Sequence, residues 1–152
     1  MAVKLEGNEI KTSYVELPDG LERVFSVMKE LRTHLDLDEF KRLVMLAHTA
    51  DGYRVVVLER GGKPLALMGY RILHDLVHGS HLYVDDLVTA KEQRSHGHGA
   101  ELLRFAEAEA RRLGLTGLRL CTGIDNDAAK KFYQREGWDV RSVVFKKKVP
   151  RH

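Results

Sequence analysis

The sequence has almost no cysteine and no long apolar run, and each absence excludes a class of protein. Cys121 is the single cysteine among 152 residues, which rules out an internal disulfide framework and predicts a reducing, cytoplasmic location. No stretch reaches the roughly 18 apolar residues that a membrane-spanning helix requires, so we expect no membrane partner. Residues 1–6 lack the apolar segment of a secretory signal.

Charge of one sign is also scarce. The formal net charge is only +3, and the Lys/Arg stretches carry no interleaved aromatic residues, so we predict no nucleic-acid partner. What is present is apolar material, at 43% of the residues. That fraction is enough for a sizeable core, and we predict one domain spanning residues 1–152.

Hydrophobic periodicity predicts a mixed α/β sheet, with strands where apolar residues alternate and helices where they recur at three- and four-residue spacing. The predicted order is β-α-α-β-β-β-α-β-α-β, over residues 9–17, 21–31, 37–48, 54–60, 64–74, 81–89, 101–113, 116–122, 127–135 and 138–148. Gly61-Gly62-Lys63 predicts a tight hairpin inside an antiparallel meander. The later strand-helix-strand order predicts a right-handed crossover and a parallel pair. Asp19 is a candidate cap for the first helix, and Asp36 or Asp38 for the second.

A glycine turn joins the strand 81–89 to the helix 101–113. The first turn of a helix has free N–H groups and a partial positive charge, and Gly97 and Gly99 let the backbone approach an anion closely. Arg94 adds a full charge and several donors. The candidate anion-binding residues are Arg94, Ser95, His96, Gly97, His98, Gly99 and Ala100.

Two familiar phosphate motifs do not fit this turn. A P-loop requires Gly-Lys-Ser/Thr, whereas Gly99 is followed by Ala100 and Glu101. A dinucleotide fingerprint requires a third glycine where Leu102 stands. A plain strand-to-helix turn is the remaining alternative, so a second motif is needed.

The second motif is the stretch 126–138, which reads NDAAKKFYQREGW. Asn126 can cap the predicted helix, and Ala129 is small. Phe132 is expected to pack inward, and Tyr133 to face a cleft. The alternative is an ordinary helix with an asparagine cap and aromatic core residues.

Together the two motifs resemble those of the GCN5-related N-acetyltransferases, the GNAT family. Residues 94–100 fit Q/R-x-x-G-x-G/A, and residues 126–138 fit N-x-x-A-x-x-F-Y-x-x-x-G-F/W. The resemblance covers the chain from about residue 9 to its end. It implies the GNAT fold, with acetyl-CoA in a cleft between splayed strands. Ser95 and His98 replace a common glycine and a common aliphatic residue, which leaves open whether His98 packs or binds.

The resemblance also implies roles for individual residues. Pantetheine is expected to pair with the end of the strand before the glycine turn, much like an added strand, and the pyrophosphate to lie on the amides of the turn. The implied cofactor-binding residues are Leu87, Val88, Thr89, Arg94, Ser95, His96, Gly97, His98, Gly99, Ala100, Asn126 and Tyr133. Tyr133 matches the family's tyrosine near the sulfur and is the predicted general acid; the alternative is a hydroxyl that only orients the cofactor.

Two adjacent acids, Asp85 and Asp86, lie in the strand 81–89. Neighbouring strand residues face opposite sides, so one acid faces the cleft unless a bulge shifts the alternation. The pattern resembles Glu-Asp-Leu-x-Val in relatives that acetylate polyamines, amino acids or small basic amines. We predict that the two acids are catalytic, attracting a cationic amine while one relays its proton through water. The alternative is a structural pair with an arginine such as Arg71.

The resulting hypothesis is an acetyl-CoA-dependent N-acetyltransferase that acts on the primary amine of a small molecule. The alternatives are a protein N-terminal or lysine acetyltransferase, and a non-catalytic acyl-CoA-binding regulatory module. His74, His78 and His81 surround one connection at loose spacing, and the family requires no metal, so none is predicted. Cys121 is interpreted as a small core residue. Relatives often dimerise through their late strands, so a homodimer stays open, as does the identity of the amine.

Overall fold

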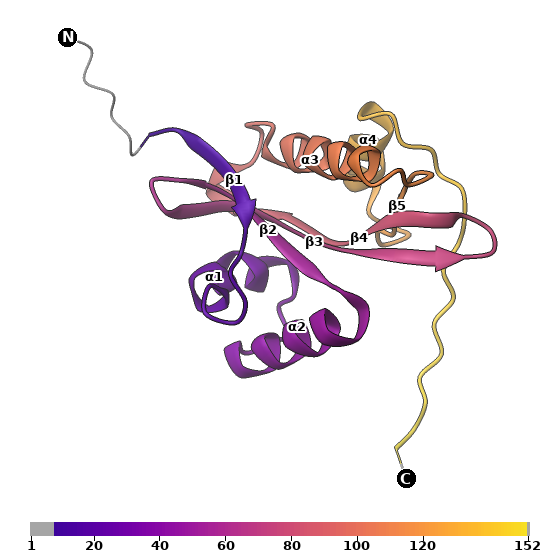
Figure 1. Cartoon of the computed structure of the whole chain (residues 1–152), viewed down its shortest axis with the longest axis horizontal. Coiled ribbons are helices and arrows are strands. Elements are labelled where there is room, and N and C mark those ends of the chain that lie inside the picture. Colours follow the sequence, from indigo (N-terminus) through magenta and orange to yellow (C-terminus); the bar gives the residue numbers. More distant parts are fainter. Residues whose placement is uncertain (1–7, 152) are drawn as a thin grey trace. The chain divides into compact units, whose positions relative to one another are not determined.

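The computed structural model describes residues 8–151, and its elements follow the predicted order except at the C-terminal end (Figure 1). They are β1 (Ile10–Tyr14), α1 (Leu21–Leu31), α2 (Leu37–Asp51), β2 (Arg54–Arg60), β3 (Lys63–Asp75), β4 (Gly79–Thr89), the 3-10 turn η1 (Lys91–Gln93), α3 (His98–Arg112), β5 (Leu118–Leu120) and α4 (Asp127–Arg135). Residues 1–6, where we expect no secretory signal, lie outside the described residues. No helix in the described part has both the length and the apolar character needed to cross a bilayer. The chain forms two compact units, which meet in the sequence between Leu120 and Cys121.

The first unit is built on one five-stranded sheet with the order β1-β2-β3-β4-β5. The strands β1 to β4 are antiparallel neighbours, which confirms the meander, and β5 lies parallel to β4, which confirms the predicted parallel pair. Arg60 pairs with Lys63 across the two-residue turn Gly61-Gly62, so the predicted hairpin is confirmed. The α/β fold class predicted from periodicity is therefore correct.

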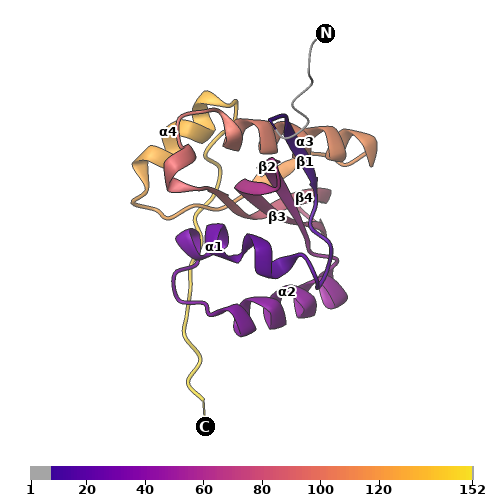
Figure 2. The same ribbon diagram turned by 90° about the vertical axis from the view of Figure 1, so that its left-hand side faces the viewer.

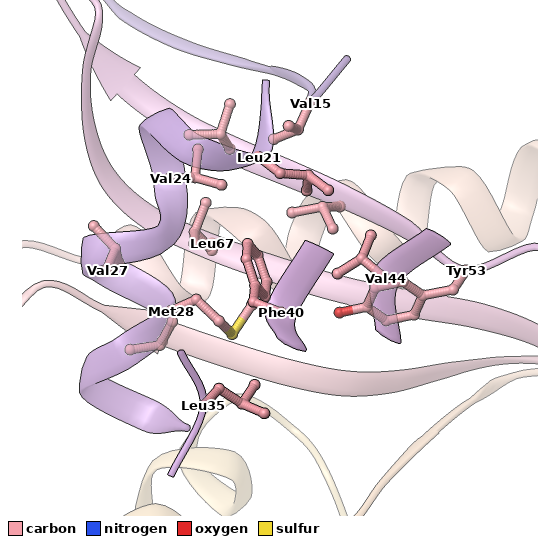
Figure 3. Close-up of a cluster of buried hydrophobic side chains, with 13 residues drawn as sticks. Val15, Leu21, Val24, Val27, Met28, Leu35, Phe40, Val44, Tyr53 and Leu67 are labelled. Atoms are coloured by element: carbon pink, nitrogen blue, oxygen red, sulfur yellow. The ribbon is translucent and has the colours of Figure 1, made fainter. Parts of the chain in front are cut away.

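Helices cover both faces of this sheet, with α1 and α2 on one face and α3 on the other (Figures 1 and 2). Because successive strand residues point to opposite faces, β2 contributes Val55 and Val57 to the core under α1 and α2, and Val56 and Leu58 to the core under α3. Figure 3 shows the first of these two cores, in which Tyr53 packs with the apolar residues. A strand covered on both faces explains the continuous Val-rich run of β2.

The helix caps agree with prediction at α2 and differ at α1. The Asp36 side chain accepts a hydrogen bond of 2.8 Å from the Glu39 amide, which confirms it as the cap of α2. The predicted Asp19 cap is wrong, because Gly20 is the residue before α1 and no side chain caps that helix. The helix α1 is held by its apolar stripe, of which Leu21 and Val24 are fully buried.

The second unit contains α4, whose bounds match the prediction. The predicted strand 138–148 is wrong, because no residue from 121 to 151 is in a strand. Its apolar side chains Val140, Val143 and Phe145 are exposed. An alternating apolar pattern makes a segment suitable for a sheet but does not supply a partner. A strand forms only where a neighbouring strand provides the inter-strand hydrogen bonds. The predicted burial of Cys121 is also wrong, because β5 ends one residue earlier and the thiol is exposed.

Candidate functional site

The loop between β4 and α3 ends in the glycine turn. Gly97 immediately precedes α3 with φ 77°, and open space lies where its Cβ would be, with no heavy atom of the described chain within 4 Å. The first α-helical bond runs from the Glu101 amide to the Gly97 carbonyl at 3.0 Å. The amides of residues 98–100 therefore precede the intrahelical ladder, and no side chain caps them. This geometry suits an anion at the start of α3.

Ser95 and His98 are the two departures from the family pattern in this loop. Ser95 has φ 67°, a conformation that costs a non-glycine residue about 1 kcal/mol and explains why glycine is common there. His98 is buried, with its ring nearly parallel to that of His96 at 5.8 Å between centroids. Burial, followed by the nearby His96 and Arg60, lowers the pKa of His98. The His98 side chain therefore packs as a neutral ring, and what it offers at the helix start is its main-chain amide.

The strands β4 and β5 separate after a short pairing. They pair only over Leu82 to Val84 and Leu118 to Leu120. Beyond that point Asp85 to Thr89 pair with β3 alone among the strands of the described chain. The edge of β4 at Leu87, Val88 and Thr89, where pantetheine is predicted to pair, thus has no neighbouring strand on its β5 side within residues 8–151.

A bulge in β4 decides how the two adjacent acids face. Tyr70 is opposite Val84 and Gly69 is opposite Asp86, so Asp85 is an extra residue between two paired positions. The bulge cancels the usual alternation, and both carboxylates reach the same side of the sheet. Both acids therefore line one cavity, whereas the usual alternation would turn only one of them toward it.

That cavity lies under α1 and α2 and has a volume of about 420 Å³. We call it the acceptor cavity, after the role that we propose for it below. Apolar side chains of both helices form part of its wall, including Met28, Phe40 and Val44. Its charged and polar lining residues are Arg32, His34, Asp51, Tyr53, Arg71, Asp85 and Asp86. Three carboxylates therefore face two guanidinium groups, which leaves an excess of negative charge.

Asp86 is held by two donors that no sequence motif indicated. The Tyr53 hydroxyl donates to Asp86 Oδ2 at 2.6 Å, and Arg32 Nε donates to Asp86 Oδ1 at 2.8 Å. Burial, followed by the Asp86 charge, raises the pKa of Tyr53 well above its ordinary value, so the phenol keeps its proton and donates it. The pair needs Gly69, because a Cβ there would lie 1.9 Å from the Tyr53 hydroxyl oxygen. An isolated glycine inside an apolar strand was the available signal of this close approach.

Asp85 is held by a bidentate ion pair. Arg71 Nε and Nη2 donate to its two carboxylate oxygens, each at 2.9 Å, so the contact with Arg71 that was considered from the sequence is present. Burial raises the pKa of Asp85 even so, against the opposing effect of Arg71. The third guanidinium nitrogen of Arg71, Nη1, lies 3.6 Å from a carboxylate oxygen of Asp51, a residue that sequence reasoning missed. Arg32 Nη2 also donates to the Asp85 carbonyl at 2.9 Å.

The second unit carries Asn126 and Tyr133. The Asn126 side chain accepts a hydrogen bond of 3.0 Å from the Ala129 amide, which confirms the cap of α4. Tyr133 is half-buried, with its ring 5.1 Å from that of Phe132 and 6.0 Å from that of Trp138. Burial raises the pKa of Tyr133, so its phenol holds a proton at neutral pH.

Comparison with known proteins assigns the chain to a family. The model of the acetyltransferase (GNAT) family matches residues 19–138. An uncharacterized N-acetyltransferase of Bacillus subtilis, YhdJ, is 32% identical over 126 residues, covering 82% of this chain and 89% of that protein. The aminoalkylphosphonate N-acetyltransferase of Salmonella typhimurium is 30% identical over 96 residues, covering 62% of this chain and 61% of that protein.

Solved structures share the fold. The aminoglycoside N-acetyltransferase AAC(6')-Iy in complex with CoA superposes with a TM-score of 0.82 at 17% identity, over 96% of this chain and 99% of that one. The glucosamine-6-phosphate N-acetyltransferase of Arabidopsis thaliana gives 0.73 at 19% identity, over 93% and 99%. The chain thus belongs to the GNAT family and is an N-acetyltransferase of that type.

Proposed function

We propose that this chain transfers the acetyl group of acetyl-CoA directly to the primary amine of a small molecule bound in the acceptor cavity. One observation carries the proposal. The bulge in β4 turns Asp85 and Asp86 into the cavity, and the next three residues form the edge that lacks a second strand. An acyl-CoA paired with that edge would present its thioester beside the cavity mouth.

The cofactor is expected to follow β4 into the glycine turn. Its pantetheine pairs with the backbone of Leu87 to Thr89, and its pyrophosphate lies on the amides of residues 95–100, with Arg94 beside it. By the family resemblance, Asn126 and Tyr133 are expected to contact the cofactor as well. The family match spans residues 19–138 and so includes segments of both units, which supports their acting as one acetyltransferase domain.

The reaction has two proton transfers that these residues can serve. An amine arrives as an ammonium, attracted by the excess of carboxylates, and gives its proton through water to Asp85. We assign the relay to Asp85 because burial raises its pKa, whereas both carboxylate oxygens of Asp86 already accept hydrogen bonds from Arg32 and Tyr53. The free amine attacks the thioester carbon, the C–N bond forms and the C–S bond breaks. The leaving thiolate takes a proton from the Tyr133 phenol. The resulting phenolate regains a proton through water from the acylated nitrogen, which leaves the neutral amide and free CoA thiol.

The acceptor class is supported by volume and charge. A cavity of about 420 Å³ accommodates a small molecule, and its excess of carboxylates favours a cationic acceptor. The named relatives above include enzymes for aminoalkylphosphonates and aminoglycosides, both small amines.

The test measures release of free CoA thiol from acetyl-CoA over a panel of small primary amines, with peptides bearing a free N-terminus or a lysine as a second arm. Turnover on a small amine supports the proposal. Turnover on peptides alone would identify a protein acetyltransferase, and acetyl-CoA binding without turnover would identify a regulatory module.

The relay is tested by the variant Asp85→Asn on whichever amine turns over. Asp85 must be ionised to accept a proton, so activity falls as the pH drops through its raised pKa. Asp85→Asn should lower kcat and abolish that acid limb while thermal unfolding shows a folded protein. A retained limb would assign the relay to another group.

A further inference from the structure

The turn between β3 and β4 gathers three metal-binding side chains away from the acceptor cavity. Asp75, His78 and His81 each offer a ligand atom, and these atoms lie within 4.8 Å of one another. The strand register explains the grouping. Asp75 is opposite Gly79, and His81 is the diagonal neighbour two residues on, so both side chains share one face. His74 is on the other face, where its ring contacts the Ser80 hydroxyl at 2.7 Å.

His81 is the decisive residue because it is buried and half-satisfied. Its side chain is 2% exposed, and its Nδ1 lies 3.1 Å from the Gly79 carbonyl. A carbonyl only accepts, so the proton is on Nδ1 and the lone pair is on Nε2. Nε2 has no hydrogen-bond partner among the described residues, and Asp75 Oδ2 is 3.9 Å from it. A ring that donates to a backbone carbonyl and leaves its other nitrogen free is the usual arrangement of a metal-ligating histidine.

Asp75 is held in place to face this nitrogen. The His78 amide donates to Asp75 Oδ1 at 2.6 Å, and the His78 ring nitrogen Nδ1 is 3.1 Å from both carboxylate oxygens. The ring of His78 is 5.1 Å from that of His81 between centroids. The carboxylate of Asp75 and the imidazoles of His78 and His81 therefore offer their ligand atoms to the same small space.

We propose that Asp75, His78 and His81 bind a divalent transition-metal ion, with Zn²⁺ as the best match and water as the fourth ligand. Two imidazoles and a carboxylate suit Zn²⁺ at bond lengths of about 2.0–2.2 Å. Binding the ion requires the side chains of His78 and Asp75, both at the surface, to turn toward Nε2 of the buried His81. The ion cross-links the end of β3 to the start of β4, so its role is to stabilise the hairpin and not to take part in acetyl transfer.

The experiment uses the untagged chain, stripped with EDTA and dialysed, and titrates it with Co²⁺ and Zn²⁺. Visible Co²⁺ absorption reports coordination by the protein, displacement of Co²⁺ by Zn²⁺ gives affinity, and thermal unfolding reports stabilisation. We expect one ion per chain and a raised Tm. His78→Ala and Asp75→Asn should each weaken binding by about tenfold or more. Both residues are at the surface, so the folds of these variants are checked by circular dichroism.

The matched control is His74→Ala, which removes a histidine of the same hairpin from the opposite face. It should bind the ion as the parent chain does. Equal loss in His74→Ala and His78→Ala, or no stoichiometric ion on a folded chain, would overturn the proposal. CoA release on the accepted amine should not change when the ion is removed at a temperature where the chain stays folded. Loss of activity under that condition would overturn the purely structural role without bearing on the acetyltransferase function itself.

Discussion

At the scale of single residues, the acceptor cavity depends on an absent side chain as much as on the charged ones. Gly69 leaves the space in which the Tyr53 hydroxyl meets Asp86. A buried tyrosine without its partner carries the cost of an unsatisfied hydroxyl, and Asp86 would lose one of its two side-chain donors. The three residues therefore act together, although they come from three separate positions in the chain.

Gly69→Ala tests this dependence. The new methyl group would force Tyr53 away from Asp86, so we expect a loss of about 1–3 kcal/mol in the free energy of unfolding and a raised KM for the amine. Urea unfolding and steady-state kinetics are the measurements. Gly117→Ala is the matched control, because, its two chain neighbours aside, no heavy atom of residues 8–151 lies within 4 Å of its Cβ position. Equal effects of the two substitutions would mean that the close approach of Tyr53 to Gly69 contributes neither to the free energy of unfolding nor to KM.

For single residues, the sequence predicted which side chains matter but not how they are oriented. Asp85 and Asp86 could be chosen from their residue type in a buried strand, but their common direction could not. A bulge places two residues of one strand opposite a single residue of the partner strand. The sequence of one strand alone therefore does not reveal where a bulge lies. Arg32 and Tyr53 reach the site from segments without a motif, so only the folded chain brings them to Asp86.

At the scale of elements, local periodicity predicted what depends on local structure. The bounds of α1, β2 and α4 agree with the prediction, because their spacing is set by the helix or strand itself. The bounds of β5 and the absence of a strand at 138–148 depend on pairing with distant residues. The helix α3 begins at His98 and not at Glu101, so Gly99 and Ala100 already belong to its first turn.

Because α3 begins at His98, Gly97 is the residue immediately before the helix. The substitution Gly97→Val therefore tests the predicted pyrophosphate site. The variant should weaken CoA binding by about tenfold, or roughly 1.4 kcal/mol, because the side chain fills the space before the first free amides. Isothermal titration with CoA measures the change. A β-branched residue at positive φ also strains the backbone by about 1–2 kcal/mol.

Gly114→Val separates strain from obstruction. Gly114 follows the other end of α3, with φ 68° and no heavy atom within 4 Å of its Cβ position. Both variants should lose similar stability, and only Gly97→Val should lose CoA affinity. Unchanged CoA affinity in Gly97→Val would place the pyrophosphate elsewhere.

At the scale of the whole molecule, the proposed chemistry draws on both units of the chain. The first unit supplies the strand edge, the glycine turn and the acceptor cavity. The second supplies the phenol of Tyr133. The match to the GNAT family model spans residues 19–138 and so includes segments of both units.

Tyr133→Phe tests the proposed role of the phenol as proton donor, because it removes the hydroxyl and leaves the ring packing against Phe132 and Trp138. If the phenol protonates the leaving thiolate, kcat should fall by about 10²–10⁴-fold while the Kd for acetyl-CoA changes little. The raised pKa of Tyr133 keeps the donor protonated, so the parent chain should show no alkaline loss of activity below the ordinary tyrosine range. Tyr70→Phe is the matched control: its hydroxyl contacts Tyr14 at 2.8 Å and belongs to neither the cavity nor the loop. Equal losses of kcat and of acetyl-CoA affinity in Tyr133→Phe would instead mean that the hydroxyl only orients the cofactor.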